Sequence, residues 1–335
     1  MTDNKNQIID QFGRAHDYLR ISLTERCNLR CFYCMPEEGI TLTEKANLMT
    51  HEEVIEIAKK FVELGVNKIR LTGGEPLLKK NLEKIIRELS SLPISLGITT
   101  NGILLDKYMD LFLECGVNDI NVSLDTLNKD KFNTITRRDY YALVKTNIDK
   151  YIKSGFNLKI NCVLIKGVND NELIDFIEYT KNRNISIRFI EFMPFDGNKW
   201  DVSKVVSLQH ILDKLYDYYG QNQVIKLNDK SNDTTKNFRI SNYTGSFGVI
   251  STVSNPFCDS CNRIRLTANG RIKNCLFSSS ETDLLTPLRN GEDIEGHILN
   301  GMYKKSKYRG GMESDRDFFD KDNFSKNRQM TIIGG

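Results

Sequence analysis

Three cysteines near the beginning of the chain have the spacing of a metal site that lacks one protein ligand. Cys27, Cys31 and Cys34 follow a strand-like apolar run and form the motif Cys-x3-Cys-x2-Cys. A structural zinc site takes four protein ligands in a tetrahedron, whereas an iron–sulfur cubane bound by three cysteines keeps one iron open to a small molecule. The motif therefore favours an iron–sulfur cluster with an open coordination position.

Zinc and disulfide bonds are the two alternatives for these thiols. Zinc needs a fourth ligand nearby, and His51 is the best local candidate among only four histidines. Disulfides fit poorly, because the chain opens with no signal peptide, contains no apolar run long enough to cross a membrane, and groups its cysteines too closely to connect distant elements. We therefore expect a cytoplasmic protein with reduced thiols.

A second cysteine triplet lies near the other end of the chain. Cys258, Cys261 and Cys275 again leave a fourth thiol missing, so this motif also favours an open iron–sulfur cluster. A zinc knuckle is the alternative, and it would need His297 or a more distant residue to complete it.

Two arginines lie inside this second triplet, in the sequence Asn262-Arg263-Ile264-Arg265. Their guanidinium groups would suit a triphosphate or carboxylate substrate beside the metal. Arginines after a turn are more often surface residues, and that interpretation stays open at this point.

A glycine-rich segment, Thr72-Gly73-Gly74-Glu75-Pro76, follows the second predicted strand. The two glycines let backbone approach a ligand closely, and the carboxylate of Glu75 can receive an ammonium group. A simple turn before a helix is the alternative.

The elements that must position these motifs alternate between strands and helices, which indicates parallel strands joined by crossover helices. Strands are predicted at 18–24, 67–72, 95–100, 118–125, 157–165 and 185–192. Helices are predicted at 79–91, 104–115, 140–154, 170–182 and 207–219, and an earlier helix begins after a capping box formed by Thr50 and Glu53 and continues to Gly65. Six such units predict an α/β fold, an incomplete (βα)6 TIM-like barrel whose open side is covered by a C-terminal α+β region.

The predicted strands alternate apolar with polar residues, although strands of a fully packed parallel barrel are usually apolar on both faces. If the apolar face packs on the helices, the opposite face lines the interior with Arg20, Arg70, Thr99, Ser123 and Lys159. Buried cations without matching acids are costly unless an anion accompanies them, so the pattern predicts a polyanionic ligand. An antiparallel sheet with its polar face in solvent is the alternative. The sixth strand, 185–192, breaks the clean alternation over residues 187–192.

Composition gives few further constraints. With 335 residues, 39% hydrophobic content and a net charge of +3, the chain suits a large core and offers no argument for nucleic acid or membrane as main partner. We divide it into a barrel region, 1–200, and a C-terminal region, 201–335, that carries the second triplet. The basic stretch 304–309 could touch phosphates, but such runs are usually solvated surface.

Taken together, these motifs resemble the GTP 3′,8-cyclases of molybdenum cofactor biosynthesis, a family of radical S-adenosylmethionine (SAM) enzymes. The resemblance runs from about Arg14 to Gly335 and includes both cysteine triplets, the Thr-Gly-Gly-Glu-Pro segment, Thr-Thr-Asn-Gly after the third strand and the terminal Gly334-Gly335. It implies a lyase with two [4Fe–4S] clusters and SAM as cofactors. A 5′-deoxyadenosyl radical would abstract hydrogen from C3′ of GTP, and C3′ would then bond to C8 to give 3′,8-cyclo-7,8-dihydroguanosine 5′-triphosphate.

The resemblance also implies roles for individual residues. Cys27, Cys31 and Cys34 would hold the first cluster and Cys258, Cys261 and Cys275 the second. SAM contacts would come from Tyr33, Gly74, Glu75, Ser123 and Met193, and GTP contacts from Arg20, Arg70, Thr99, Lys159, Arg263, Ile264 and Arg265. Arg263, Arg265, Gly334 and Gly335 would serve catalysis, although by sequence alone the tail is expected to fray.

Partners implied by the resemblance are GTP as substrate, a reductant protein as electron donor and the downstream cyclic pyranopterin monophosphate synthase. Nucleic acid and membrane are not expected partners, and a homodimer is compatible with the resemblance. The alternative enzyme class is a peptide- or RNA-modifying radical SAM protein with an auxiliary cluster. A zinc-stapled binding module is the alternative without enzymatic activity.

Overall fold

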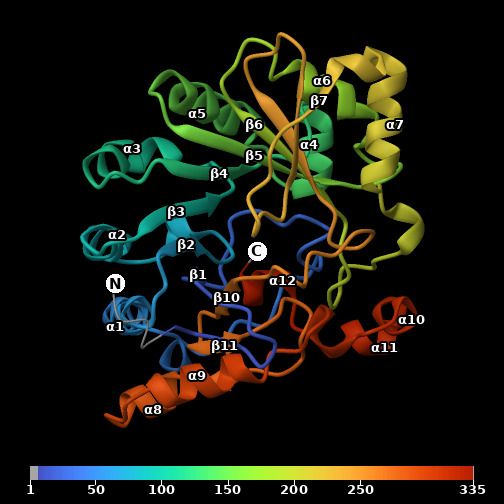
Figure 1. Ribbon diagram of the computed structural model, residues 1–335. Helices are drawn as coiled ribbons and strands as arrows, with labels where there is room; N and C mark the ends of the chain where they lie inside the picture. The colour runs from blue at the N-terminus through green and yellow to red at the C-terminus, as the bar shows by residue number, and fades with distance from the viewer. Residues whose placement is uncertain (1–6, 335) are drawn as a thin grey trace, which may run out of the picture.

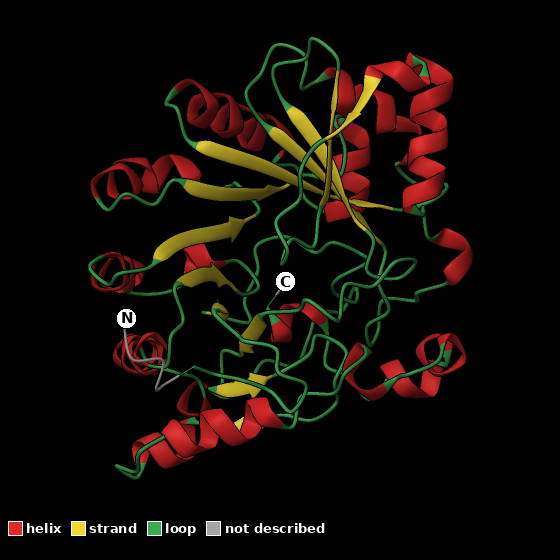
Figure 2. Cartoon of the chain, viewed as in Figure 1, coloured by secondary structure: helices red, strands yellow, loops and turns green. Residues whose placement is uncertain are grey.

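The computed structural model describes residues 7–334, whose strands form one 12-stranded sheet in the order β12-β11-β10-β1-β2-β3-β4-β5-β6-β9-β8-β7. Figure 2 shows these strands arranged in an arc around a central region of loops. Helices α1, α2, α3 and α5 lie along the outer side of the arc (Figure 1). The sheet is open, as expected for an incomplete barrel.

Residues 18–191 supply the six parallel strands predicted from the sequence. They are β1 (Tyr18–Ser22), β2 (Lys68–Thr72), β3 (Ser95–Thr100), β4 (Asp119–Ser123), β5 (Asn157–Leu164) and β6 (Ser186–Glu191), each paired in parallel with the next. The helices are α1 (His51–Glu63), α2 (Leu82–Ser90), α3 (Leu105–Glu114), α4 (Lys129–Thr136), α5 (Tyr141–Lys153) and α6 (Leu173–Glu178). The antiparallel alternative is therefore wrong for these strands.

Two local differences from the prediction have simple causes. Helix α4 was not predicted, because its short sequence buries only Phe132, Ile135 and Thr136 and gives a weak periodic signal. The predicted helix 170–182 is a one-turn 3-10 helix followed by the short α6. The capping box of α1 is confirmed: Thr50 Oγ1 accepts from Glu53 N at 3.2 Å, and Glu53 Oε2 accepts from Thr50 N at 2.7 Å.

The second half of the chain extends the sheet at both edges. Its strands are β7 (Val224–Lys226), β8 (Lys236–Ile240), β9 (Ser246–Ile250), β10 (Arg263–Leu266), β11 (Arg271–Lys273) and β12 (Thr282–Asp283). Its helices are α7 (Leu208–Tyr219), α8 (Leu285–Arg289), α9 (Glu295–Tyr303), α10 (Asp315–Phe319), α11 (Lys321–Phe324) and α12 (Met330–Ile333). One-turn 3-10 helices lie at Lys45–Asn47, Pro76–Leu78, Asp170–Glu172, Val202–Lys204, Gln221–Gln223 and Arg309–Gly311. Strand β9 pairs with β6 and β10 with β1, both in parallel, so C-terminal strands flank the barrel opening.

The apolar face of the strands forms the main core, as the alternation predicted. Leu19, Ile21, Ile69 and Ile120 are fully buried in one cluster with apolar side chains of the surrounding helices, including Phe61 of α1. Burial of this face turns the other face of each strand toward the interior of the arc. Polar side chains of neighbouring strands are thereby brought together on the concave side.

Within the described residues, no helix is long and apolar enough to span a membrane. The division into 1–200 and 201–335 stays a prediction, since the strands of both regions share one sheet.

Candidate active site

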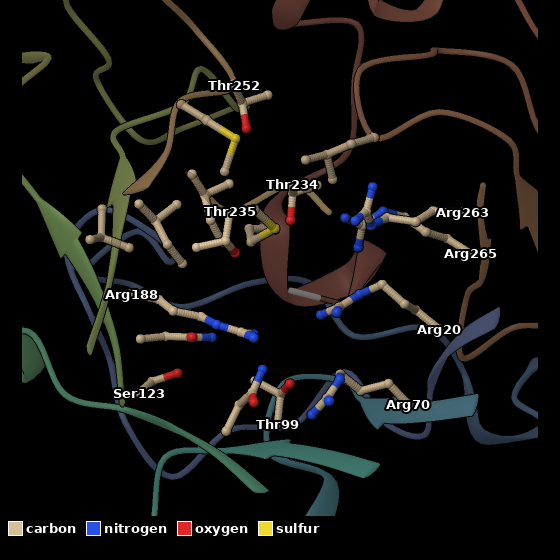
Figure 3. A pocket seen from close by; sticks show the side chains of 18 of the residues that line it. Arg20, Arg70, Thr99, Ser123, Arg188, Thr234, Thr235, Thr252, Arg263 and Arg265 are labelled. Atoms are coloured by element: carbon tan, nitrogen blue, oxygen red, sulfur yellow. The ribbon is translucent and has the colours of Figure 1, made fainter. Parts of the chain in front are cut away.

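A cavity of about 730 Å³ lies inside the arc, and both cysteine triplets line it. The six cysteines are Cys27, Cys31, Cys34, Cys258, Cys261 and Cys275. Figure 3 shows five arginines pointing into this space: Arg20 from β1, Arg70 from β2, Arg188 from β6, and Arg263 and Arg265 from β10. Motifs that lie more than two hundred residues apart in the sequence therefore share one chamber with a cluster of cations.

The first triplet occupies the loop after β1. Backbone hydrogen bonds attach this loop to the end of α4, from Arg30 N to Thr136 O at 2.9 Å and from Phe32 N to Ile135 O at 3.1 Å. Burial raises the pKa of the Cys34 thiol to about 12, although a hydrogen bond from the Thr331 backbone opposes this shift. A buried thiolate at this position needs a metal to hold it ionised.

The second triplet surrounds strands β10 and β11. Cys258 and Cys261 precede β10, and Cys275 follows β11. Cys261 Sγ accepts from Lys305 Nζ at 3.3 Å. Although burial opposes ionisation, the charges of Lys305 and Arg263 lower the pKa of Cys261 to about 7.

Neither triplet is arranged around a single metal ion in the part of the chain that the structure describes. All eight cysteines are free thiols. Within residues 7–334, no group of three or more His, Cys, Asp or Glu side chains converges closely enough to hold one metal ion. Zinc ligands lie about 2.0–2.3 Å from one ion, whereas the thiolates of a cubane each bind a different iron and stand farther apart. His51 and His297, the histidines considered as fourth zinc ligands, do not line the cavity.

The two glycines of the Gly-Gly-Glu segment are required by backbone packing against the cysteine loop. A Cβ at Gly73, where φ is +150°, would lie 2.6 Å from Thr24 O, and one at Gly74 would lie 2.4 Å from Arg26 O. Gly74 N donates to Thr24 O at 2.6 Å. Both glycines line the cavity, so the segment attaches the loop of the first triplet to the end of β2 and also faces the ligand space.

The sequence predicts that Glu75 receives an ammonium group of the ligand directly, but Glu75 does not line the cavity. Its carboxylate is 1% exposed and accepts from Thr100 Oγ1 and Asn101 N, each at 2.7 Å, and from Leu77 N at 3.1 Å. Burial raises its pKa to about 7. Glu75 therefore connects the glycine-rich segment to the end of β3.

Replacing Glu75 with alanine should lower the free energy of unfolding by about 3 kcal/mol, because three buried donors lose their acceptor. Denaturant unfolding of the metal-free protein measures this change. Glu56→Ala, at an exposed position of α1, is the matched control and should stay within about 0.5 kcal/mol of the parent. Equal stability of the Glu75 and Glu56 variants would contradict the structural role.

Three of the expected SAM contacts, Tyr33, Ser123 and Met193, line the cavity near the first triplet's loop or the ends of β4 and β6. Tyr33 Oη donates to Asp125 Oδ2 at 2.7 Å, and Val163 N donates to Asp125 Oδ1 at 2.8 Å. Asp125 was not among the predicted site residues, although it follows β4 directly. It fixes the ring of Tyr33 at the wall of the cavity.

The strand register aligns three arginines in one row. Arg20 of β1 lies opposite Arg70 of β2 on one side and Arg265 of β10 on the other. Like charges placed directly opposite each other are destabilising, so the row needs anions. The side chain of Arg70 extends over β3 at Gly97, where a Cβ would lie 3.0 Å from Arg70 Nη2 and 2.8 Å from Asp119 O.

The expectation that the interior cations lack matching acids is wrong for two of them. Asp119 pairs with both Arg70 and Lys159. Burial works against ionisation of Asp119, but the charges of Arg70 and Lys159 lower its pKa to about 2. Asp119 shares its strand face with Asn121 and Ser123, so the alternation itself carried the signal that identifies it.

Other cations keep the cavity positive. Within the part of the chain that the structure describes, Arg188, Arg263 and Arg265 have no carboxylate within 4.0 Å. Arg188 was missed as a site residue because β6 was thought to break the alternation. The two faces of β6 do alternate, but the residue types do not follow them: Arg188 and Ile190 line the cavity, while Glu191 is buried on the other face and accepts from Val253 N at 2.7 Å.

The remaining GTP candidates divide into two groups. Thr99 lines the cavity, as expected. Ile264 is fully buried in the core and does not line the cavity, so the structure does not place it among the groups that face a ligand. The loop between β7 and β8 contributes Asn232, Thr234 and Thr235 to the lining, although its polar sequence gave no functional signal.

The C-terminal tail is placed inside the arc rather than frayed. Helix α12 lies at the centre of the molecule (Figure 1), and Met330 and Thr331 line the cavity. Gly334 has φ +87°, and its carbonyl accepts from Arg265 Nη1 at 2.8 Å. Gly335, the other predicted tail residue, lies outside the described residues. The tail thus reaches from the first triplet's loop to the arginine row.

Comparisons with known proteins agree with this arrangement. The pattern of the Radical SAM superfamily matches residues 21–180, and the pattern named Molybdenum Cofactor Synthesis C matches residues 185–310. The chain is 45% identical to the mitochondrial GTP 3′,8-cyclase of Arabidopsis thaliana, covering 98% of this chain and 84% of that protein. It is 42% identical to the GTP 3′,8-cyclase of Peptoclostridium acidaminophilum, covering 96% of this chain and 98% of that protein.

Longer relatives and solved structures extend these similarities. Molybdenum cofactor biosynthesis protein 1 of Dictyostelium discoideum is 43% identical, and the chain spans 53% of its length. Streptococcus suis SuiB bound to S-adenosylmethionine has a TM-score of 0.60 at 16% identity, covering 88% of this chain and 70% of that one. This structural similarity shows a shared fold.

Proposed function

This chain belongs to the GTP 3′,8-cyclase family of radical SAM enzymes, and we propose that its cavity carries out that reaction. The enzyme is a lyase that converts GTP to 3′,8-cyclo-7,8-dihydroguanosine 5′-triphosphate, the first step of molybdenum cofactor biosynthesis. Its cofactors are SAM and two [4Fe–4S] clusters. The observation that carries the proposal is the convergence of two open cysteine triplets on one cation-lined cavity.

The cofactors supply the radical chemistry and the chain supplies orientation. When bound, the first cluster and SAM would supply a 5′-deoxyadenosyl radical for hydrogen abstraction from C3′ of GTP. Cys27, Cys31 and Cys34 would hold the first cluster, and Cys258, Cys261 and Cys275 would hold the second. Tyr33, Gly74, Ser123 and Met193 contact SAM, and Asp125 keeps Tyr33 in position.

The positive end of the cavity suits the triphosphate of GTP. Arg20, Arg70 and Lys159 come from the barrel strands, whereas Arg263 and Arg265 come from β10 beside the second triplet. Guanidinium groups bind phosphate oxygens through paired N–H donors. Bound triphosphate would offset the repulsion within the arginine row. The nucleotide would then extend from this row toward the second cysteine triplet, which lines the same cavity.

The cavity must also protect a reactive intermediate from water and stray hydrogen donors. Apolar side chains that line it near the tail include Ile190, Leu276, Phe277 and Met330. Phe277 stacks on Phe195 with ring centroids 6.1 Å apart, and both belong to a second apolar cluster that includes Ile333 of the tail. The tail and this cluster therefore close one side of the chamber.

The decisive experiment is anaerobic incubation of the full chain with GTP, SAM and a reductant, followed by mass analysis of the nucleotides. We expect a product that has the mass of GTP, because it is an isomer of GTP, but that separates from GTP by chromatography before the mass analysis, formed together with 5′-deoxyadenosine. Reconstituted protein should contain about eight irons, because two four-iron clusters are bound. About two zinc ions with no iron would contradict the proposal, as would 5′-deoxyadenosine without any cyclised nucleotide.

Several finer assignments are part of the same proposal. A reductant protein delivers the electron, and a cyclic pyranopterin monophosphate synthase uses the product. A cytoplasmic location suits free thiols and reduced clusters. A homodimer and the division at residue 200 stay predictions, and nothing favours a peptide or RNA substrate over GTP.

A further inference from the structure

The basic stretch 304–309 is not solvated surface throughout, as its sequence suggested. Lys305 is only 2% exposed and Arg309 only 6%, while Lys304 is exposed. Both buried residues lie against the second cysteine triplet: Lys305 Nζ is 3.3 Å from Cys261 Sγ, and Arg309 N donates to Cys258 Sγ at 3.5 Å. The segment therefore forms part of the surroundings of the second cluster.

Lys305 lacks the partner that a buried ammonium group usually has. Within residues 7–334, no carboxylate forms an ion pair with it. Its Nζ donates to Arg263 O at 2.9 Å and to the sulfur of Cys261. A buried cation is costly unless an anion accompanies it, and the Cys261 thiolate is the anion within reach.

The position of Lys305 is fixed from both sides. Gln11 Nε2 donates to Lys305 O at 3.3 Å, and Arg14 Nη1 joins Cys258 O at 2.8 Å to Lys307 O at 3.0 Å. Gly310, with φ +69°, lies so close to the neighbouring segment that a Cβ there would be 2.5 Å from Ser278 N. The ammonium group is therefore held beside one chosen thiolate.

The first triplet has no equivalent cation in hydrogen-bond contact with its sulfur atoms among the described residues. Cys27 Sγ accepts from the backbone N–H of Leu29 at 3.4 Å and lies 3.9 Å from the amide Nδ2 of Asn101. These donors are neutral. The two triplets therefore offer a cluster different electrostatic surroundings.

We propose that Lys305 is a positioning residue that raises the reduction potential of the second cluster through its charged hydrogen bond to Cys261. Hydrogen bonds to cluster sulfurs and nearby charge set the potentials of iron–sulfur centres. One-electron reduction adds a negative charge to the cluster, so an adjacent ammonium group favours the reduced form. The inference rests on the proposed function, because it requires a cluster bound by Cys258, Cys261 and Cys275.

The test uses the full chain with Cys27, Cys31 and Cys34 replaced by alanine, so that only the second cluster assembles. After anaerobic reconstitution, this parent should contain about four irons. A redox titration followed by electron paramagnetic resonance then gives the potential of the remaining cluster. Lys305→Met removes charge and donor while keeping the length of the side chain, and Lys304→Met is the matched control at an exposed position.

With Lys305→Met, we expect the ratio of reduced to oxidised cluster at a fixed potential to fall about tenfold, a shift of about 59 mV for a one-electron couple. Lys304→Met should keep the parent value, and Lys305→Arg should restore most of it. An unchanged potential in a Lys305→Met protein that retains about four irons would overturn the proposal.

The remaining outcomes are also decisive. If Lys305→Met loses iron, Lys305→Gln is measured instead. Glutamine keeps a neutral donor, so the reduction potential should shift in the same direction by a smaller amount. Loss of iron in both variants would assign Lys305 to cluster assembly and overturn its role in setting the potential. A parent protein that binds no iron would instead contradict the proposed function itself.

Discussion

Replacing Gly334 with alanine is expected to lower the rate of GTP cyclisation about 100-fold or more, while cleavage of SAM persists. A Cβ at this position would lie 2.7 Å from Ser22 Cβ and 2.9 Å from Thr72 Oγ1, at the ends of β1 and β2. The tail would have to move, and Arg265 would lose the Gly334 carbonyl that it binds at 2.8 Å. A small displacement of a positioning group is enough to cost two orders of magnitude in rate.

Gly291→Ala is the matched control for this variant. Gly291 has φ +76°, close to the +87° of Gly334, but no atom lies within 4 Å of an added Cβ. Both alanines carry the strain of a left-handed backbone, and only the one at 334 meets other atoms, those of Ser22 and Thr72 at the ends of β1 and β2. Cyclisation and 5′-deoxyadenosine formation are measured in parallel, together with iron content.

Removal of Gly334 and Gly335 should have the same effect as Gly334→Ala: GTP cyclisation falls, while SAM cleavage persists. Iron content should stay near that of the parent, because the described tail residues contribute no cysteine to either triplet. Full cyclisation by the truncated protein would show that the tail is incidental to the reaction.

Arg263→Ala should weaken GTP binding about 100-fold, while SAM cleavage survives. Arg263 projects into the cavity from β10, and within the described residues no carboxylate lies within 4.0 Å of it. Its guanidinium packs over the rings of Tyr18 and Phe257, at 5.8 and 5.3 Å from the ring centroids, and therefore has a defined direction. Loss of a charged donor at such a position removes about 2–3 kcal/mol of binding free energy.

Lys159→Ala tests whether a cavity cation that is already paired with a carboxylate contributes less to GTP binding than Arg263 does. Lys159 already pairs with Asp119, so its removal should cost GTP affinity about tenfold, less than loss of Arg263. Arg239→Ala, at an exposed position of β8, should leave affinity unchanged. Anaerobic calorimetry with GTP measures all three variants. Unchanged affinity in both cavity variants would reject the triphosphate assignment.

Much of the fold follows from local sequence signals. Strand alternation identified which face of β1 to β5 packs on the helices, because side chains on a strand point to opposite sides in turn. The capping box located the start of α1. The rule that apolar residues face the helices and polar residues face the interior fails at β6, where Glu191 lies on the outer face and Ile190 lines the cavity. There the buried carboxylate of Glu191 accepts hydrogen bonds from Val253 N and Ser254 N, which are distant in the sequence.

The sequence by itself determined the ligand chemistry: two cysteine triplets, each one thiolate short, and a polar interior strand face. Tertiary structure alone decided that both triplets meet in one cavity, that Asp119 neutralises part of the arginine and lysine charge, and that the tail and Lys305 are buried beside the metal sites. The physical reason is that residue type and periodicity report local conformation. Burial and pairing across the sheet depend instead on segments brought together only by folding.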